Sequence, residues 1–116
     1  MMYAITKQVI SQKRLFMNIA LIGYGRMGHE IESIAVKRGH FIKLIIDQYN
    51  EDDLNKVNLT DIDAAIEFTS PDAAFSNVCK CLNEKVPTVS GTTGWLENYN
   101  EAAELCIENK TSFIHS

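Results

Sequence analysis

The sequence feature that most constrains the fold is Gly23-Tyr24-Gly25-Arg26-Met27-Gly28, which directly follows the apolar run of residues 17–22. Three glycines at this spacing, between a buried strand and a helix, suit a tight turn beside a bound ligand. We interpret Gly23 as the turn residue and Gly25 as the point where the backbone approaches a ligand. Gly28 would let the helix pack closely. The sequence therefore predicts a strand–turn–helix unit here.

The hydrophobic period changes after the glycine turn. Met27, Ile31, Ile34 and Ala35 recur at the spacing of one helical face, which predicts a helix packed through these four residues. Gly39 is a suitable residue to follow its end. Residues 41–46 are apolar apart from Lys43 and predict a second buried strand.

The rest of the chain repeats this alternation. We expect strands over residues 64–68, 88–90 and 112–114, a loop with one helical turn over 48–63, and helices over 71–84 and 97–109. The helix over 71–84 should face the core through Phe75, Val78, Cys79 and Leu82. Such alternation predicts an α/β fold, a Rossmann-like doubly wound parallel sheet in three αβα layers. The sequence ends within the last predicted strand, and we interpret this as a sheet that is truncated at its C-terminus.

The glycine turn also predicts chemistry. The N-terminus of the helix that follows it would offer free N–H groups to a pyrophosphate, and Arg26 would add positive charge. Asp47 lies 24 residues after Gly23, near the spacing of about 20 at which an acid bonds the adenosine ribose. A carboxylate there should repel a 2′-phosphate, so NADH is the preferred cofactor over NADPH. The alternative for Asp47 is a solvated acid at the end of a strand.

Two further segments follow predicted strands at the edge where ligands bind in open α/β sheets. These segments are Phe68-Thr69 and Gly91-Thr92-Thr93-Gly94. Gly91 allows close approach, and the threonine hydroxyls suit a carboxamide or a ribose. From the residues alone, a plain polar turn fits these segments as well as a cofactor contact does.

Several other functions find no support. The net charge of −4 gives no electrostatic case for nucleic acid, and no apolar run reaches the roughly 20 residues of a membrane span. The three cysteines lack metal or redox spacing, so we expect buried structural thiols in a reducing cytoplasm. The three histidines are isolated, so no catalytic residue is assigned. Asp61, Asp63 and Glu67 are interpreted as solvated or strand-end acids, without a metal.

Residues 1–16 carry three basic residues and no acidic one. We interpret them as a disordered basic extension, with a targeting segment as the alternative. Residues 17–116 would then form the dinucleotide-binding domain.

Three motifs together carry a family resemblance: the glycine turn from Ile22 to Gly28, the segment from Ile66 to Pro71, and the segment from Val89 to Trp95. In this combination the chain resembles 4-hydroxy-tetrahydrodipicolinate reductase, also called dihydrodipicolinate reductase. The match runs from Met17 onward and concerns the N-terminal domain alone. Two departures are Glu67, where the family often has Asp, and Trp95, where Phe is common.

The resemblance implies hydride transfer from NADH or NADPH to a cyclic dicarboxylate in lysine and diaminopimelate biosynthesis, by a cytoplasmic homotetramer. It places the pyrophosphate on residues 23–28 and the adenosine ribose on Asp47. It also places the nicotinamide end against Phe68, Thr69, Gly91, Thr92 and Thr93. The family's substrate-domain motifs are missing from this sequence, so we expect cofactor binding without turnover.

Two alternatives remain from the sequence. One is a stand-alone NAD-binding module that senses or regulates without catalysis. The other is a homoserine- or aspartate-type dehydrogenase, which shares the glycine turn, although the Gly-Thr-Thr-Gly segment argues against it.

Overall fold

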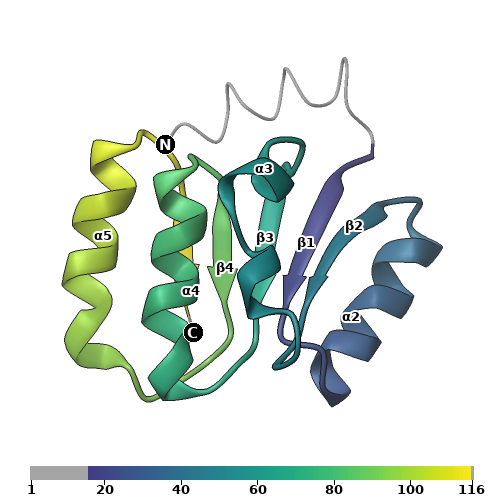
Figure 1. The fold of residues 1–116 in the computed structure, drawn as a ribbon, viewed down its shortest axis with the longest axis horizontal. Coiled ribbons are helices and arrows are strands. Elements are labelled where there is room, and N and C mark those ends of the chain that lie inside the picture. Colours follow the sequence, from purple (N-terminus) through teal and green to yellow (C-terminus); the bar gives the residue numbers. More distant parts are fainter. Residues whose placement is uncertain (1–15, 116) are drawn as a thin grey trace.

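A computed structural model describes residues 16–115 of the chain. Within this range five strands form one parallel sheet, in the order β2-β1-β3-β4-β5 (Figure 1). The extension predicted over residues 1–16 lies, apart from Phe16, outside the described residues. The elements follow one another as β1 (Asn18–Ile22), α2 (Arg26–Lys37), β2 (Phe41–Ile46), the 3-10 turn η1 (Glu51–Asp53), α3 (Lys56–Leu59), β3 (Ala64–Glu67), α4 (Pro71–Asn83), β4 (Thr88–Ser90), the 3-10 turn η2 (Leu96–Asn98), α5 (Tyr99–Glu108) and β5 (Phe113–His115).

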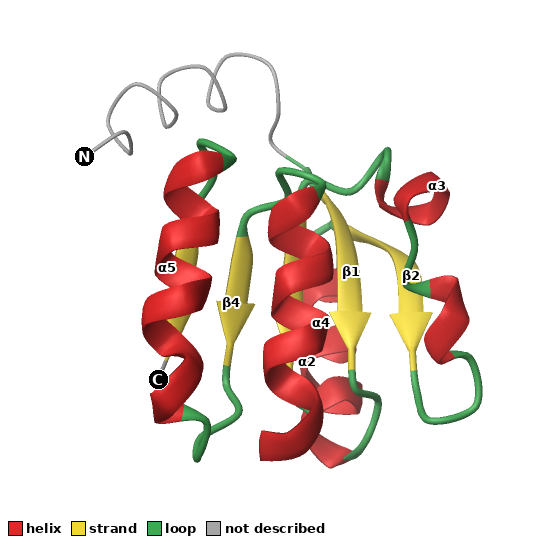
Figure 2. Cartoon of the chain, turned by 60° about the vertical axis from the view of Figure 1, so that its left-hand side comes forward, coloured by secondary structure: helices red, strands yellow, loops and turns green. Residues whose placement is uncertain are grey.

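The sheet separates two layers of helices, because successive side chains of a strand point to opposite faces. Ile19 and Leu21 of β1 pack against Ala35 of α2. Ala20 and Ile22 point the other way and join the core formed with α3 and α4. A further cluster, centred on Trp95, joins α4 to α5 on that same side. The strands run side by side in one direction (Figure 2), so the predicted doubly wound αβα architecture is confirmed.

The second strand is less buried than the sequence predicts. β2 is the first strand in the sheet order and pairs with β1 alone in the described structure. Phe41 at its start is 59% exposed, whereas Ile46 at its end is buried. The apolar run records strand propensity, but whether a strand becomes central or an edge depends on which strands pair with it.

The packing face of α2 also differs from the prediction. The prediction is right for Ile31 and Ala35, which lie on the covered side together with Gly28, but wrong for Met27 and Ile34, which are 45% and 52% exposed. A Cβ built on Gly28 would lie 2.6 Å from the carbonyl oxygen of Gly23. The helix is therefore turned so that its glycine, rather than Met27, meets the preceding turn.

On α4 the prediction is right for Val78 and Leu82, which are buried. Cys81 is buried as well, while Cys79 and Phe75 are half-buried. The buried set is wider than predicted because α4 contacts the sheet on one side and α5 on another. Of the three thiols, only Cys81 matches the expectation of a fully buried cysteine.

Candidate functional site

The last residues of the five strands lie in one row across the sheet. Ile22 is in register with Ile46 and with Glu67, Glu67 with Ser90, and Ser90 with His115. The loops after these strands therefore start from the same edge. The chain winds from β1 to β2 on one side and from β3 to β5 on the other, so the order reverses between β1 and β3. Crevices form at such a reversal.

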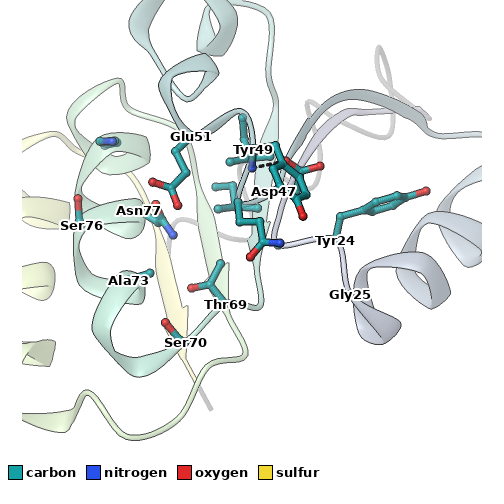
Figure 3. A pocket seen from close by; sticks show the side chains of 15 residues that line it. Tyr24, Gly25, Asp47, Tyr49, Glu51, Thr69, Ser70, Ala73, Ser76 and Asn77 are labelled. Atoms are coloured by element: carbon teal, nitrogen blue, oxygen red, sulfur yellow. Dashed lines mark hydrogen bonds between the residues drawn. The ribbon is translucent and has the colours of Figure 1, made fainter.

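A cavity of about 730 Å³ opens at this reversal (Figure 3). It lies between the glycine turn, the loop after β2 and the first turns of α4. Five of the predicted site residues line it: Gly23, Tyr24, Gly25, Asp47 and Thr69. The other lining residues are Ile22, Ile46, Gln48, Tyr49, Glu51, Ser70, Ala73, Ser76, Asn77 and Lys80.

The glycine turn is held tightly on one side and open on the other. Gly23 has a φ of +99°, and a Cβ there would lie 1.9 Å from the carbonyl oxygen of Phe68. Its N–H donates to the carbonyl of Ile46 at 2.8 Å. Gly25, by contrast, has nothing within 4 Å of a built Cβ. The protein itself does not require glycine at position 25, so that position leaves backbone open toward the cavity.

Gly25 is also the N-cap residue of α2, and no side chain caps this helix end. The first turn of α2 contains no acidic residue. Arg26 is exposed there and, like Met27 and Gly28, does not line the cavity. An uncapped helix N-terminus carries partial positive charge and unsatisfied N–H groups, which together suit an anion.

Tyr24 contributes to the cavity wall, but its ring points away from Asp47 and Thr69 (Figure 3). The ring stacks on His29 with centroids 3.8 Å apart, and the hydroxyl donates to the Glu32 carboxylate. That hydrogen bond is the main cause of the raised pKa of Tyr24, with desolvation and the Glu32 charge contributing less. The Tyr24 side chain thus anchors the turn to α2.

Asp47 follows β2 at the cavity mouth. Its Oδ1 accepts from the N–H of Tyr49 at 2.8 Å, and its own N–H donates to Asn50 Oδ1 at 2.7 Å. Asn50 Nδ2 in turn donates to the carbonyl of Ile45 at 2.8 Å. Oδ2 of Asp47 has no hydrogen bond within residues 16–115. The loop therefore holds the half-buried carboxylate in place and leaves one oxygen for a ligand.

The opposite wall of the cavity is formed by α4, and none of its lining residues was predicted from the sequence. Ala73, Ser76, Asn77 and Lys80 recur at helical spacing and face the cavity together. The signal was present as a small and polar stripe on the helix side opposite to the apolar one.

The segments Phe68-Thr69 and Gly91-Thr92-Thr93-Gly94, which were predicted to follow strands at the ligand edge, are arranged differently from the prediction. A Cβ on Gly91 would lie 2.0 Å from the ring of Phe68, so glycine is needed for that ring to pack. Thr92 is buried and Thr93 is exposed. Phe68, Gly91, Thr92 and Thr93 lie beside the cavity rather than in its wall, with Thr69 as the link between them.

Of the two alternatives predicted for Glu67, a solvated or a strand-end acid, the structure supports the second and contradicts the first. Its side chain is completely buried. Its carboxylate accepts from Ser90 Oγ at 2.5 Å, from Thr92 Oγ1 at 2.6 Å, and from both the N–H, at 2.8 Å, and the hydroxyl of Thr69. Glu67 ends β3, and its position in the sheet points it into the layer between the strands and α4.

A metal site and a reactive thiol find little support in the described residues. Residues 16–115 hold no group of three or more metal-binding side chains that could bind an ion. Burial raises the pKa of the Cys81 thiol to about 12, which leaves it unreactive. No helix in the described part of the chain is long and apolar enough to cross a membrane.

Comparison with solved structures identifies the class. The fold matches aspartate dehydrogenase from Thermotoga maritima with a TM-score of 0.63 and 17% identity, over 85% of this chain and 45% of that one. It matches CapF with a TM-score of 0.59 and 19% identity, over 85% of this chain and 29% of that one. Together, the parallel sheet and the glycine turn at its strand-order reversal define a Rossmann-like domain.

Within that class, the chain belongs to the dihydrodipicolinate reductase family, since residues 17–116 match the model described as its N-terminus. The 4-hydroxy-tetrahydrodipicolinate reductase of Christiangramia forsetii is 47% identical over 86% of this chain. The enzyme of the same name from Bifidobacterium longum subsp. infantis is 33% identical over 73% of it. The chain covers 41% and 34% of these two relatives, respectively.

Proposed function

We propose that residues 17–116 form the cofactor-binding domain of an NAD(P)H-dependent 4-hydroxy-tetrahydrodipicolinate reductase. The observation that carries this proposal is one cavity that joins the open backbone at Gly25 to the carboxylate of Asp47. These two groups match two adjoining parts of an adenosine diphosphate moiety, the pyrophosphate and the ribose. The role in lysine and diaminopimelate biosynthesis, the cytoplasmic location and the tetrameric assembly of the whole enzyme are parts of the same proposal.

The residues present fit the cofactor. The uncapped N-terminus of α2 would hold the pyrophosphate, with Arg26 beside it, and the free Oδ2 of Asp47 would accept from the adenosine ribose. Thr69 lines the cavity and connects it to the neighbouring residues that would contact the nicotinamide end, which are Phe68, Gly91, Thr92 and Thr93. When bound, the reduced nicotinamide supplies the hydride. The chain's own residues bind and orient it.

The Asp47 carboxylate should make the site prefer NADH, because it repels a 2′-phosphate. Lys80 on the facing wall is the cation that opposes this preference. We expect fluorescence titration of the purified chain to give NADH a lower Kd than NADPH by about tenfold, equal to about 1.4 kcal/mol. Asp47→Asn should weaken NADH binding and narrow that ratio. The control is Asp52→Asn, which removes an exposed acid outside this cavity. Tighter binding of NADPH than of NADH would contradict the assignment.

The reductase assignment can be tested by joining the chain to the part of a relative that it does not cover. We expect the 116-residue chain to bind NADH without turnover, and its fusion to the remaining segment of the Christiangramia forsetii relative to oxidise NADH with 4-hydroxy-tetrahydrodipicolinate. The assay follows absorbance of the reduced cofactor. Turnover by the chain alone would contradict the proposed inactivity. A folded, NADH-binding fusion without activity would contradict the reductase assignment.

A further inference from the structure

The buried carboxylate of Glu67 sits where two loops of the candidate site meet. It accepts four hydrogen bonds, and all four donors are uncharged. They come from Thr69 in the loop after β3, from Ser90 at the end of β4, and from Thr92 in the loop after β4. An ionised carboxylate has about four acceptor sites and no donor. Glu67 is therefore saturated by groups from both loops.

Other contacts make the same junction rigid. The N–H of Thr69 also lies 2.8 Å from Thr92 Oγ1, and the N–H of Gly91 donates to the backbone carbonyl of Glu67 at 2.8 Å. Phe68, between Glu67 and Thr69, packs its ring where a side chain on Gly91 would lie. The carbonyl of Phe68 lies against Gly23 in the same way. A shift at Glu67 would thus move residues of three loops.

The direction of the hydrogen bonds has a chemical consequence. Each hydroxyl has one proton, and the hydroxyls of Thr69 and Thr92 both direct theirs to Glu67. Thr69 lines the cavity, and its hydroxyl can then offer only lone pairs there. A ligand group that meets Thr69 must therefore be a donor, as the amide NH₂ of a carboxamide is.

We propose that Glu67 is a positioning residue that orients the Thr69 hydroxyl as an acceptor for the nicotinamide carboxamide and locks the two loops around that end of the cofactor. This inference rests on the proposed function. Glu67 does not line the cavity. It acts through Thr69 and Thr92, and a neutral amide at position 67 would force at least one of their hydroxyls to reverse.

The test compares two ligands that differ at the nicotinamide end, NADH and ADP-ribose. In the full chain, we expect Glu67→Gln to raise the Kd of NADH about tenfold while that of ADP-ribose changes less than about twofold, a differential of about 1.4 kcal/mol. Thr92→Val, which removes one donor with little change of shape, should shift the same ratio in the same direction. Thr88→Val is the matched control, because its buried hydroxyl donates to the carbonyl of Val86, just before β4, and is not one of the donors to Glu67.

The outcomes distinguish failure of the positioning role from failure of the proposed function. If Glu67→Gln does not fold, the Thr92→Val ratio decides the question. An unchanged NADH to ADP-ribose ratio in the folded variants, with only stability lowered, would overturn the positioning role. Equal affinity of the unaltered chain for both ligands would overturn it too, yet would leave the adenosine and pyrophosphate sites standing. If the unaltered chain binds neither ligand, the proposed function itself fails.

Discussion

At the scale of single residues, Gly23 and Gly25 are two positions apart and meet different demands. Gly23 has a backbone conformation that favours glycine and is wedged against Phe68. Gly25 has ordinary backbone angles, with a φ of −88°, and open space beside it. Folding requires the first glycine, whereas only a ligand would require the second.

Alanine substitutions should separate these two demands. Gly23→Ala should lower the free energy of unfolding by about 2–4 kcal/mol, through backbone strain and the clash with Phe68. Gly25→Ala should change it by no more than about 0.5 kcal/mol, yet weaken NADH binding at least about tenfold by filling the space of the pyrophosphate. Urea denaturation and NADH titration measure the two effects. A Gly25→Ala variant with unchanged NADH affinity would remove Gly25 from the site.

Cys81 predicts a pH dependence. Burial, more than the charge of Glu67, raises its thiol pKa to about 12, although a hydrogen bond with Thr88 opposes the shift. The unfolded chain loses this proton near pH 9, so the neutral buried thiol stabilises the fold fully below pH 9. That contribution falls as the pH rises toward 12, by up to about 1.4 kcal/mol per pH unit.

Urea denaturation between pH 8 and pH 11 checks this sign. The stability difference between the unaltered chain and Cys81→Ala should shrink as the pH rises. A difference that stays constant would show that the Cys81 thiol ionises equally easily in the folded and unfolded chains.

At the scale of elements, α2 is fixed by its glycine rather than by its largest apolar side chains. Gly28 must meet the carbonyl of Gly23, and this contact turns Ile31 and Ala35 inward and Ile34 outward. The N-cap residue of α2, Gly25, lines the cavity. The helix is therefore both a packing element and the candidate anion site.

A pair of substitutions on α2 tests this rotation. Ile31→Ala should lower the free energy of unfolding by about 1–2 kcal/mol, since Ile31 is half-buried against the core. Ile34→Ala should change it by less than about 0.5 kcal/mol, since this residue is 52% exposed. Thermal or urea denaturation of both variants gives the comparison. Equal losses would favour the face predicted from periodicity.

At the scale of the whole molecule, the site exists only because separate loops start from one edge of the sheet. The cavity combines the turn after β1, the loop after β2 and the start of α4. No single segment contains it, so a ligand in the cavity would hold these three parts together and stabilise the fold as a unit.

We therefore expect NADH to raise the thermal unfolding midpoint. At a free concentration of about 100 times Kd, binding to the native state adds about 2.7 kcal/mol, or roughly 10 °C for a domain of this size. Asp47→Asn should lose most of this shift at the same NADH concentration, while Asp52→Asn keeps it. A midpoint that does not respond to NADH would contradict binding by the folded domain.

Local sequence patterns were enough to predict the order of strands and helices along the chain, the αβα class and the position of the glycine turn. These features follow from local patterns, because apolar runs, helical periodicity and glycine spacing are each contained within a short segment of the sequence. The family resemblance, confirmed over residues 17–116, rests on equally local motifs. The sequence also named five residues that the cavity brings together, since the ends of parallel strands must share an edge.

Features that depend on residues far apart in the sequence could be seen only in the folded chain. Phe41 is exposed because β2 pairs on one side alone, and Met27 is exposed because Gly28 sets the rotation of α2. Glu67 is buried because Ser90 and Thr92, more than 20 residues away, supply its hydrogen bonds. A charge enters the core only where such donors converge, and that convergence is a property of the folded sheet.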